Sequence, residues 1–140
     1  MLTLNEFKAA RAVLSGVILN TNLIYSPALS KTTGNHIYLK PENMQVTGAY
    51  KIRGAYYKIS TLSQEEKSRG LITASAGNHA QGVAYAAQAA RVSATIVMPT
   101  TTPLVKVNNT KDYGAEVILQ GETFDDAAAL AAQLSEERGL

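Results

Sequence analysis

The residues best suited to chemistry lie in the stretch SAGNHAQG, residues 75–82. It follows the short apolar run LITA and precedes an alanine-rich run, a pattern that predicts a turn from a strand into a helix. Gly77 permits a tight turn, and Ser75 or Asn78 can cap the helix. Backbone N–H groups of residues 75–79 would then face outward at the positive end of the helix, where carboxylates and phosphates bind. An ordinary strand-to-helix turn with a capping serine is the alternative, and the dinucleotide and P-loop glycine patterns are absent.

A second candidate is Lys51, in the stretch TGAYKIRGA near the start of a predicted helix. Because Tyr50 and Ile52 flank it, we expect a desolvated amine, the condition in which lysine forms Schiff bases. The alternative is a solvated surface lysine, and Tyr50 would then be a core or interface aromatic.

The elements that position these residues follow from hydrophobic periodicity and capping signals. Three capping boxes are expected, Thr3 with Glu6, Ser63 with Glu66, and Thr123 with Asp126. Residues 20–45 read as loop and edge strand, with extended runs around Ile24 and at 36–40. The predicted strands are 71–74, 94–98 and 115–119, and the predicted helices are an opening helix through Ile18, then 47–60, 63–70, 79–90, 103–113 and 123–139.

Successive strand-then-helix units with short apolar strands predict an α/β fold. We expect a three-layer arrangement, a parallel sheet with flanking helices. In such sheets ligands bind beyond the carboxyl ends of the strands, which is where residues 75–79 lie.

Composition excludes several classes of function. The chain has 140 residues, a formal net charge of +2 and 46% hydrophobic residues, which is a globular composition. Its lysines and arginines are spread along the chain, so we expect no nucleic-acid partner. There is no cysteine, and His36 and His79 are the only histidines, so we expect no metal site. No apolar run reaches the roughly 18 residues of a membrane span, and we expect a cytoplasmic protein without a membrane partner.

Taken together, the motifs resemble a known family. The order LKPENMQVTGAYKIRGA, then SAGNHAQGVAYAA, then IVMPTTTPLVKVNNTKDYGAEV is similar to the threonine dehydratase branch of the fold type II pyridoxal 5'-phosphate (PLP) enzymes, the tryptophan synthase β-like superfamily. The resemblance covers essentially the whole chain. It implies that residues 1–45 are the N-terminal segment of the large PLP domain and residues 46–140 a small α/β domain, incomplete at its C-terminus.

The resemblance also implies roles for single residues. Lys51 would be the catalytic lysine that carries PLP, Asn78 would contact the cofactor's 3'-oxygen, and Tyr50 would replace the family's phenylalanine as an aromatic wall. The substrate carboxylate would be held by the loop formed by Ser75, Ala76, Gly77, Asn78 and His79.

The implied activity is that of a PLP-dependent lyase. It would eliminate water from L-threonine or L-serine, giving 2-oxobutanoate or pyruvate plus ammonia, in isoleucine biosynthesis or threonine catabolism. Serine racemases have a serine acid/base where this chain has Ala76, so elimination is favoured over racemisation. A serine racemase or serine dehydratase relative, a noncatalytic α/β anion-binding module and a purely structural fragment are the alternatives.

Family members continue with a glycine-rich loop that holds the cofactor phosphate, and no glycine-rich run follows Gly82. We therefore expect a fragment of a longer enzyme, with weak or absent activity alone. We also expect it to form a homo-oligomer through uncovered apolar surface along Phe7, Leu14 and Val17, or at the sheet edge.

Overall fold

A parallel three-stranded sheet is the centre of the computed structural model, which describes residues 2–140. Its strands are β3 (Leu71–Ala74), β4 (Ala94–Met98) and β5 (Glu116–Leu119), in the order β3-β4-β5. Ile72 pairs with Thr95, and Ile96 pairs with Val117. All five residues of β4 are buried, as expected for a strand covered on both faces.

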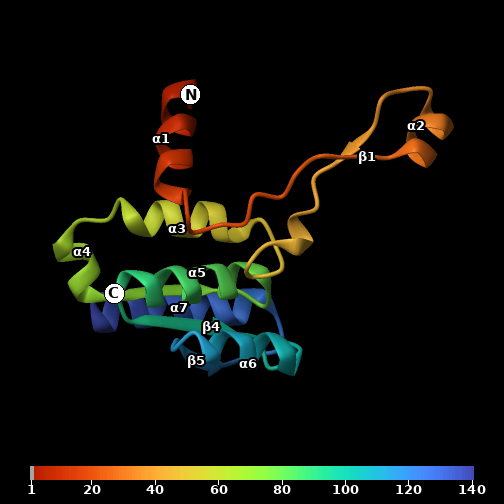
Figure 1. The fold of residues 1–140 in the computed structure, drawn as a ribbon. Helices are drawn as coiled ribbons and strands as arrows, with labels where there is room; N and C mark the ends of the chain where they lie inside the picture. The colour runs from red at the N-terminus through yellow and green to blue at the C-terminus, as the bar shows by residue number, and fades with distance from the viewer. Residues whose placement is uncertain (1) are drawn as a thin grey trace.

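Helices cover both faces of this sheet (Figure 1). α5 (Asn78–Ala90) and α6 (Leu104–Asp112) lie on one face, and α7 (Phe124–Arg138) lies on the other. Successive side chains of β4 point to opposite faces of the sheet. Ile96 and Met98 pack with α5 and α6, while Val97 packs with α7. The predicted three-layer α/β arrangement is confirmed.

α3 (Lys51–Ser60) forms a further layer outside α5 and is followed by α4 (Gln64–Arg69). The helix was expected to begin at Thr47, but it begins only at Lys51. Gly48 has φ +68° and its N–H donates to the Gln45 carbonyl oxygen at 2.7 Å, so residues 45–48 form a turn that delays the helix. Lys51 is consequently the first residue of α3.

The N-terminal part extends away from these layers (Figure 1). α1 (Leu4–Leu14) packs against α3, and an arm follows with β1 (Ile24–Tyr25), α2 (Pro27–Thr33), β2 (Tyr38–Leu39) and a short 3₁₀ turn, η1 (Glu42–Met44). The two expected extended runs pair as an antiparallel ladder. The interpretation of the residues between them as loop was wrong, because they form α2.

The three predicted capping boxes are all present, at the starts of α1, α4 and α7. Two smaller expectations were wrong. Pro103 precedes α6 as its N-cap instead of lying in its first turn. Leu14 is 6% exposed and belongs to the core, whereas Phe7 is 60% exposed as expected. Within residues 2–140, no helix combines the length and the apolarity that crossing a bilayer requires.

Candidate active site

The turn between β3 and α5 presents a set of free hydrogen-bond donors. Ser75 is buried, and its Oγ accepts from the N–H groups of Gly77 at 3.3 Å and Ala80 at 3.2 Å. The N-cap of α5 is Gly77, which neither predicted candidate occupies, although Ser75 supplies a side-chain acceptor to the first turn of the helix. The N–H groups of Ala76, Asn78 and His79 make no hydrogen bond within the described residues 2–140. They lie at the positive end of a thirteen-residue helix, which suits them to an anion.

Gly77 keeps the space above this turn open. A Cβ built on Gly77 would meet no heavy atom within 4 Å, so a larger side chain would project into that space. Ala76 and Asn78 on either side are exposed, and His79 is half-buried. The turn is thus accessible to a small ligand.

The backbone of Lys51 lies against α5 at Gly82. A Cβ added to Gly82 would lie 3.2 Å from the Lys51 carbonyl carbon and 3.2 Å from the Ile52 nitrogen. Only glycine lets the first turn of α3 approach α5 this closely. The fully buried Ile52 anchors that turn, and Lys51 beside it stays exposed, so the expected desolvation of the Lys51 amine is not observed.

The Lys51 charge also acts on His79 of the turn. The pKa of His79 is lowered, first because the imidazole is partly buried and second because the Lys51 charge is close to it. Lys51 Nζ also lies 5.3 Å from the centre of the Tyr50 ring, which is cation–π range. The predicted residues Tyr50, Lys51 and His79 therefore lie in one neighbourhood.

Two polar contacts tie this neighbourhood to α6. Lys106 Nζ donates to Asn78 Oδ1 at 2.6 Å, and Asn109 Nδ2 donates to Gln81 Oε1 at 3.1 Å. Sequence reasoning missed Lys106, Asn109 and the role of Gly82. The sequence did contain a signal for Gly82. A glycine inside a helix lowers helix stability by about 1 kcal/mol relative to alanine, so its presence suggests a close packing contact. The α6 residues carried none, because their role depends on tertiary packing.

Some buried polar side-chain atoms have no hydrogen-bond partner. Within residues 2–140 they are Thr47 Oγ1, Gln81 Nε2 and Thr102 Oγ1. Gln81 lies near the start of α5, where its Oε1 accepts from Asn109 of α6. Such atoms are expensive to bury unpaired, so each of them can take a further polar partner.

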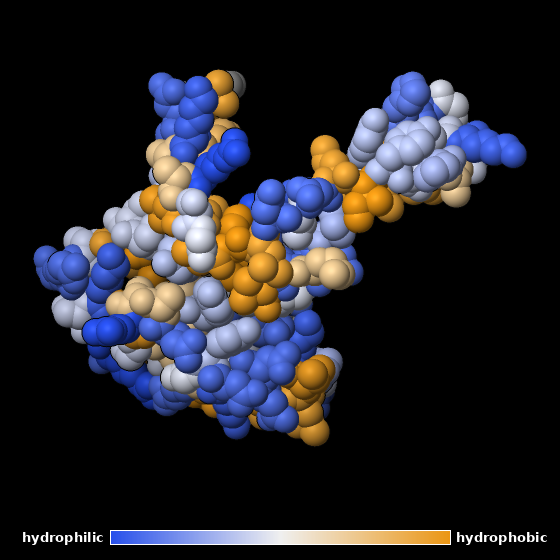
Figure 2. All heavy atoms as spheres, viewed as in Figure 1, coloured by the Kyte–Doolittle hydropathy of each residue, from blue (hydrophilic) through white to orange (hydrophobic). Residues whose placement is uncertain are grey.

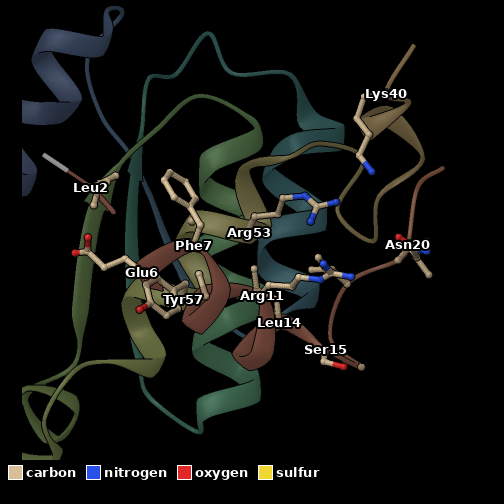
Figure 3. Close-up of a pocket in the computed structure, with 15 residues that line it drawn as sticks. Leu2, Glu6, Phe7, Arg11, Leu14, Ser15, Asn20, Lys40, Arg53 and Tyr57 are labelled. Atoms are coloured by element: carbon tan, nitrogen blue, oxygen red, sulfur yellow. The ribbon is translucent and has the colours of Figure 1, made fainter. Parts of the chain in front are cut away.

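A larger hollow lies elsewhere. An apolar groove of about 900 Å³ runs between α1 and α3, and Figure 3 shows Phe7, Leu14, Arg53 and Tyr57 among its lining side chains. None of the predicted site residues lines it.

Comparison with known proteins identifies the family of this chain. A family model described as "Pyridoxal-phosphate dependent enzyme" matches residues 14–140. The chain belongs to this family. An L-threonine ammonia-lyase of Thermotoga maritima is 53% identical over 139 residues, which are 99% of this chain and 35% of the relative. A catabolic L-threonine dehydratase of Staphylococcus aureus is 48% identical over 141 residues, covering 100% of this chain and 41% of the relative.

Solved structures of the family share the fold. The processed form of threonine deaminase isoform 2 from Solanum lycopersicum superposes with a TM-score of 0.83 at 42% identity, over 99% of this chain and 42% of that one. Maize serine racemase gives a TM-score of 0.89 at 33% identity, over 96% of this chain and 41% of that one. The expected fold type II architecture is confirmed, and the chain spans 35% to 41% of the curated relatives' length.

Proposed function

We propose that this chain carries the lysine-bearing part of a PLP-dependent lyase that eliminates water from L-threonine or L-serine. The products would be 2-oxobutanoate or pyruvate, plus ammonia. The observation that carries the proposal is the close approach of α3 to α5 at Gly82, which puts Lys51 beside a turn with three free backbone donors. We propose the same division as the sequence indicated, residues 1–45 with the large domain and 46–140 as the small domain.

The residues present fit PLP. The exposed Lys51 amine can reach an aldehyde, the Asn78 amide can donate to a phenolic oxygen, and Tyr50 offers an aromatic face. The open space over Gly77 and the unpartnered N–H groups of Ala76, Asn78 and His79 give an anionic ligand room and hydrogen bonds. PLP, when bound, supplies the electron sink for breaking a bond at the substrate's Cα.

The chain's own residues then have separate tasks. The N–H groups of Ala76, Asn78 and His79 hold the substrate carboxylate, and Ser75 shapes the turn by accepting from two further N–H groups. A carboxylate held there turns the substrate's Cα toward α3, where Lys51 Nζ accepts its proton. Because the pKa of His79 is lowered, its ring stays neutral near pH 7 and can donate a hydrogen bond without adding charge.

Ala76 favours elimination over racemisation. Racemisation needs an acid on the face of Cα opposite the lysine, and an alanine methyl group has no proton to give. The likeness to maize serine racemase keeps a serine-racemising relative as the second candidate. The D-serine formed from L-serine, relative to the pyruvate formed, separates the two.

Attachment of PLP at Lys51 is the direct test. The purified chain is incubated with PLP, reduced with borohydride, and its modified lysines are mapped by mass spectrometry. We expect one dominant adduct at Lys51 that disappears in Lys51→Ala and persists in Lys58→Ala, a change of another exposed lysine on α3. Labelling of Lys51 no greater than that of Lys58 would overturn the proposal.

A homo-oligomer is part of the same proposal. Leu4 and Phe7 are 69% and 60% exposed on α1, and Figure 2 shows apolar surface where α1 meets α3. Light scattering should give more than one chain per particle, and a monomer at high concentration would contradict this part.

A further inference from the structure

α5 and α6 are joined by two polar contacts of matched spacing. On α5 the acceptors are Asn78 and Gln81, three residues apart, and on α6 the donors are Lys106 and Asn109, also three residues apart. Residues three apart share one face of a helix, so the contacts form two successive rungs between facing surfaces. The first rung lies at the turn that we propose holds the substrate.

Both rungs have the same polarity. In each, α6 supplies the N–H donor and a side-chain carbonyl oxygen on α5 accepts. The first rung cannot be reversed, because an ammonium group has three donors and no acceptor. Lys106 therefore bonds the Asn78 oxygen, and within residues 2–140 the Asn78 Nδ2 donors keep no partner.

The helix backbone that carries Lys106 is firmly placed. Its neighbours Val107 and Thr110 are 3% and 0% exposed, so one face of α6 is packed in the core. The Lys106 N–H donates to the Pro103 carbonyl oxygen at 2.8 Å, and its own carbonyl oxygen accepts from Thr110 Oγ1 at 2.8 Å. The backbone that carries the ammonium is fixed at both of its polar groups.

We propose that Lys106 is a positioning residue, which engages Asn78 Oδ1 so that Asn78 presents its Nδ2 donors to an anionic oxygen of the bound ligand. This inference rests on the proposed function, in which that oxygen is the phenolic oxygen of PLP. Without Lys106 the Asn78 amide can turn either way, and half of its orientations would put a carbonyl oxygen against an anion. Lys106 acts through Asn78 and does not take part in the chemistry.

The first test needs no cofactor. The Asn78 side-chain amide is followed by ¹⁵N NMR in the wild-type chain, Lys106→Met, Lys106→Arg and the control Lys111→Met, which removes an exposed lysine elsewhere on α6. We expect Lys106→Met alone to move the Nδ2 signals to the averaged values of a freely rotating asparagine, and Lys106→Arg to restore them. If Lys106→Met keeps the wild-type signals, the proposal is wrong.

The second test reads the consequence with PLP bound. Hydrogen bonds from Asn78 favour the ionised phenolic oxygen and lower the pH at which the visible absorption of bound PLP titrates. We expect Lys106→Met to raise this midpoint by about half a unit, the scale of one modest hydrogen bond, with Lys106→Arg and Lys111→Met near wild type. Equal midpoints in all four chains would overturn the proposal. If PLP does not attach to wild-type Lys51, the proposed function fails, while the NMR test still decides whether Lys106 orients Asn78.

Discussion

The groove between α1 and α3 and the turn after β3 differ in what they offer a ligand. The groove between α1 and α3 has a volume of about 900 Å³ and a largely apolar lining. The turn after β3 is open and shallow, but it gathers three free backbone N–H groups, Lys51 and the Asn78–Lys106 pair. Size alone would select the groove as the binding site. The free donors are the reason that we propose the turn, and not the groove, as the site.

The N-terminal segment and the rest of the chain also differ in the interactions that stabilise them. Residues 46–140, the body, contain the fully buried Ile96, Val97 and Met98. Residues 2–45, the N-terminal segment, leave many large apolar side chains exposed, among them Leu4, Phe7, Leu19, Leu23 and Ile24.

A group of polar contacts holds the end of that segment together and joins it to α3. Glu42 accepts from Arg53 of α3 at 2.7 and 2.8 Å and from the Thr21 hydroxyl, and Gln45 bonds both the N–H and the carbonyl oxygen of Leu19. We call these five residues the polar clasp. The body is stabilised by apolar burial. The N-terminal segment is joined to α3 by the packing of α1 and by the Glu42–Arg53 pair of the clasp.

The largest expected effect is on the free energy of unfolding, and it should differ between a side chain in the body and one in the N-terminal segment. Ile96→Ala should cost roughly 2–5 kcal/mol of unfolding free energy, because Ile96 is 0% exposed and its removal leaves a cavity. Phe7→Ala in the groove should cost under about 1 kcal/mol, since that ring is already mostly in water. Urea unfolding of both variants measures the difference. Equal costs would mean that the N-terminal segment is part of the same core.

The polar clasp should be the acid-sensitive part of the molecule. Hydrogen bonds from Arg53 are the main reason that the pKa of the Glu42 carboxyl is lowered from 4.5 to about 2. A carboxyl with a lowered folded pKa stabilises fully above its unfolded value, so the contribution is present above pH 4.5 and is lost as the pH falls toward 2. Glu42→Gln should remove about 1–2 kcal/mol, a figure that allows for the partly exposed Arg53.

Hydrogen exchange of the Leu19 and Thr21 amides measures this loss. They should exchange faster at low pH, relative to their intrinsic rates, and also in Glu42→Gln, while the β4 amides stay protected. Glu65→Gln, a change of an exposed carboxyl on α4, should leave both sets unchanged. Simultaneous loss of protection in β4 would show that the two regions unfold together.

Substitutions of two glycines should have the smallest effect on stability, and the effect of each should be local. Gly82→Ala should destabilise the body by about 1 kcal/mol and reduce PLP attachment at Lys51, because the new methyl group pushes the first turn of α3 off α5. Gly54→Ala, within α3, should stabilise by about 0.5–1 kcal/mol, since a Cβ there meets nothing within 4 Å. Thermal melts and lysine mapping compare the two. If Gly82→Ala labels Lys51 as well as wild type does, the close approach does not position the lysine.

Local signals account for the parts of the fold that were predicted well. The strands at 71–74 and 94–98 match residue for residue, because each is a short apolar run with a turn or loop at both ends. Capping boxes marked three helix starts for a similarly local reason, a side chain bonding a backbone three residues away.

The misses have physical causes as well. Pro27 was interpreted as a breaker, although Ser26, Pro27 and Gly34 are the N-cap, first residue and C-cap of α2. Ser75 to His79 were expected to form an anion-binding turn from local sequence, and their free amides agree with that interpretation. The Asn78–Lys106 contact joins residues 28 positions apart, and only the packing of α6 on α5 creates it.

Binding of a substrate carboxylate distinguishes the turn from the groove most directly. L-threonine is titrated into the ¹⁵N-labelled chain at neutral pH and the backbone amide shifts are followed. We predict saturable shifts at Ala76, Asn78 and His79, with the Phe7 and Tyr57 amides unmoved. Shifts that are largest around Phe7 and Tyr57, with the turn unchanged, would contradict the assignment of the site to the turn.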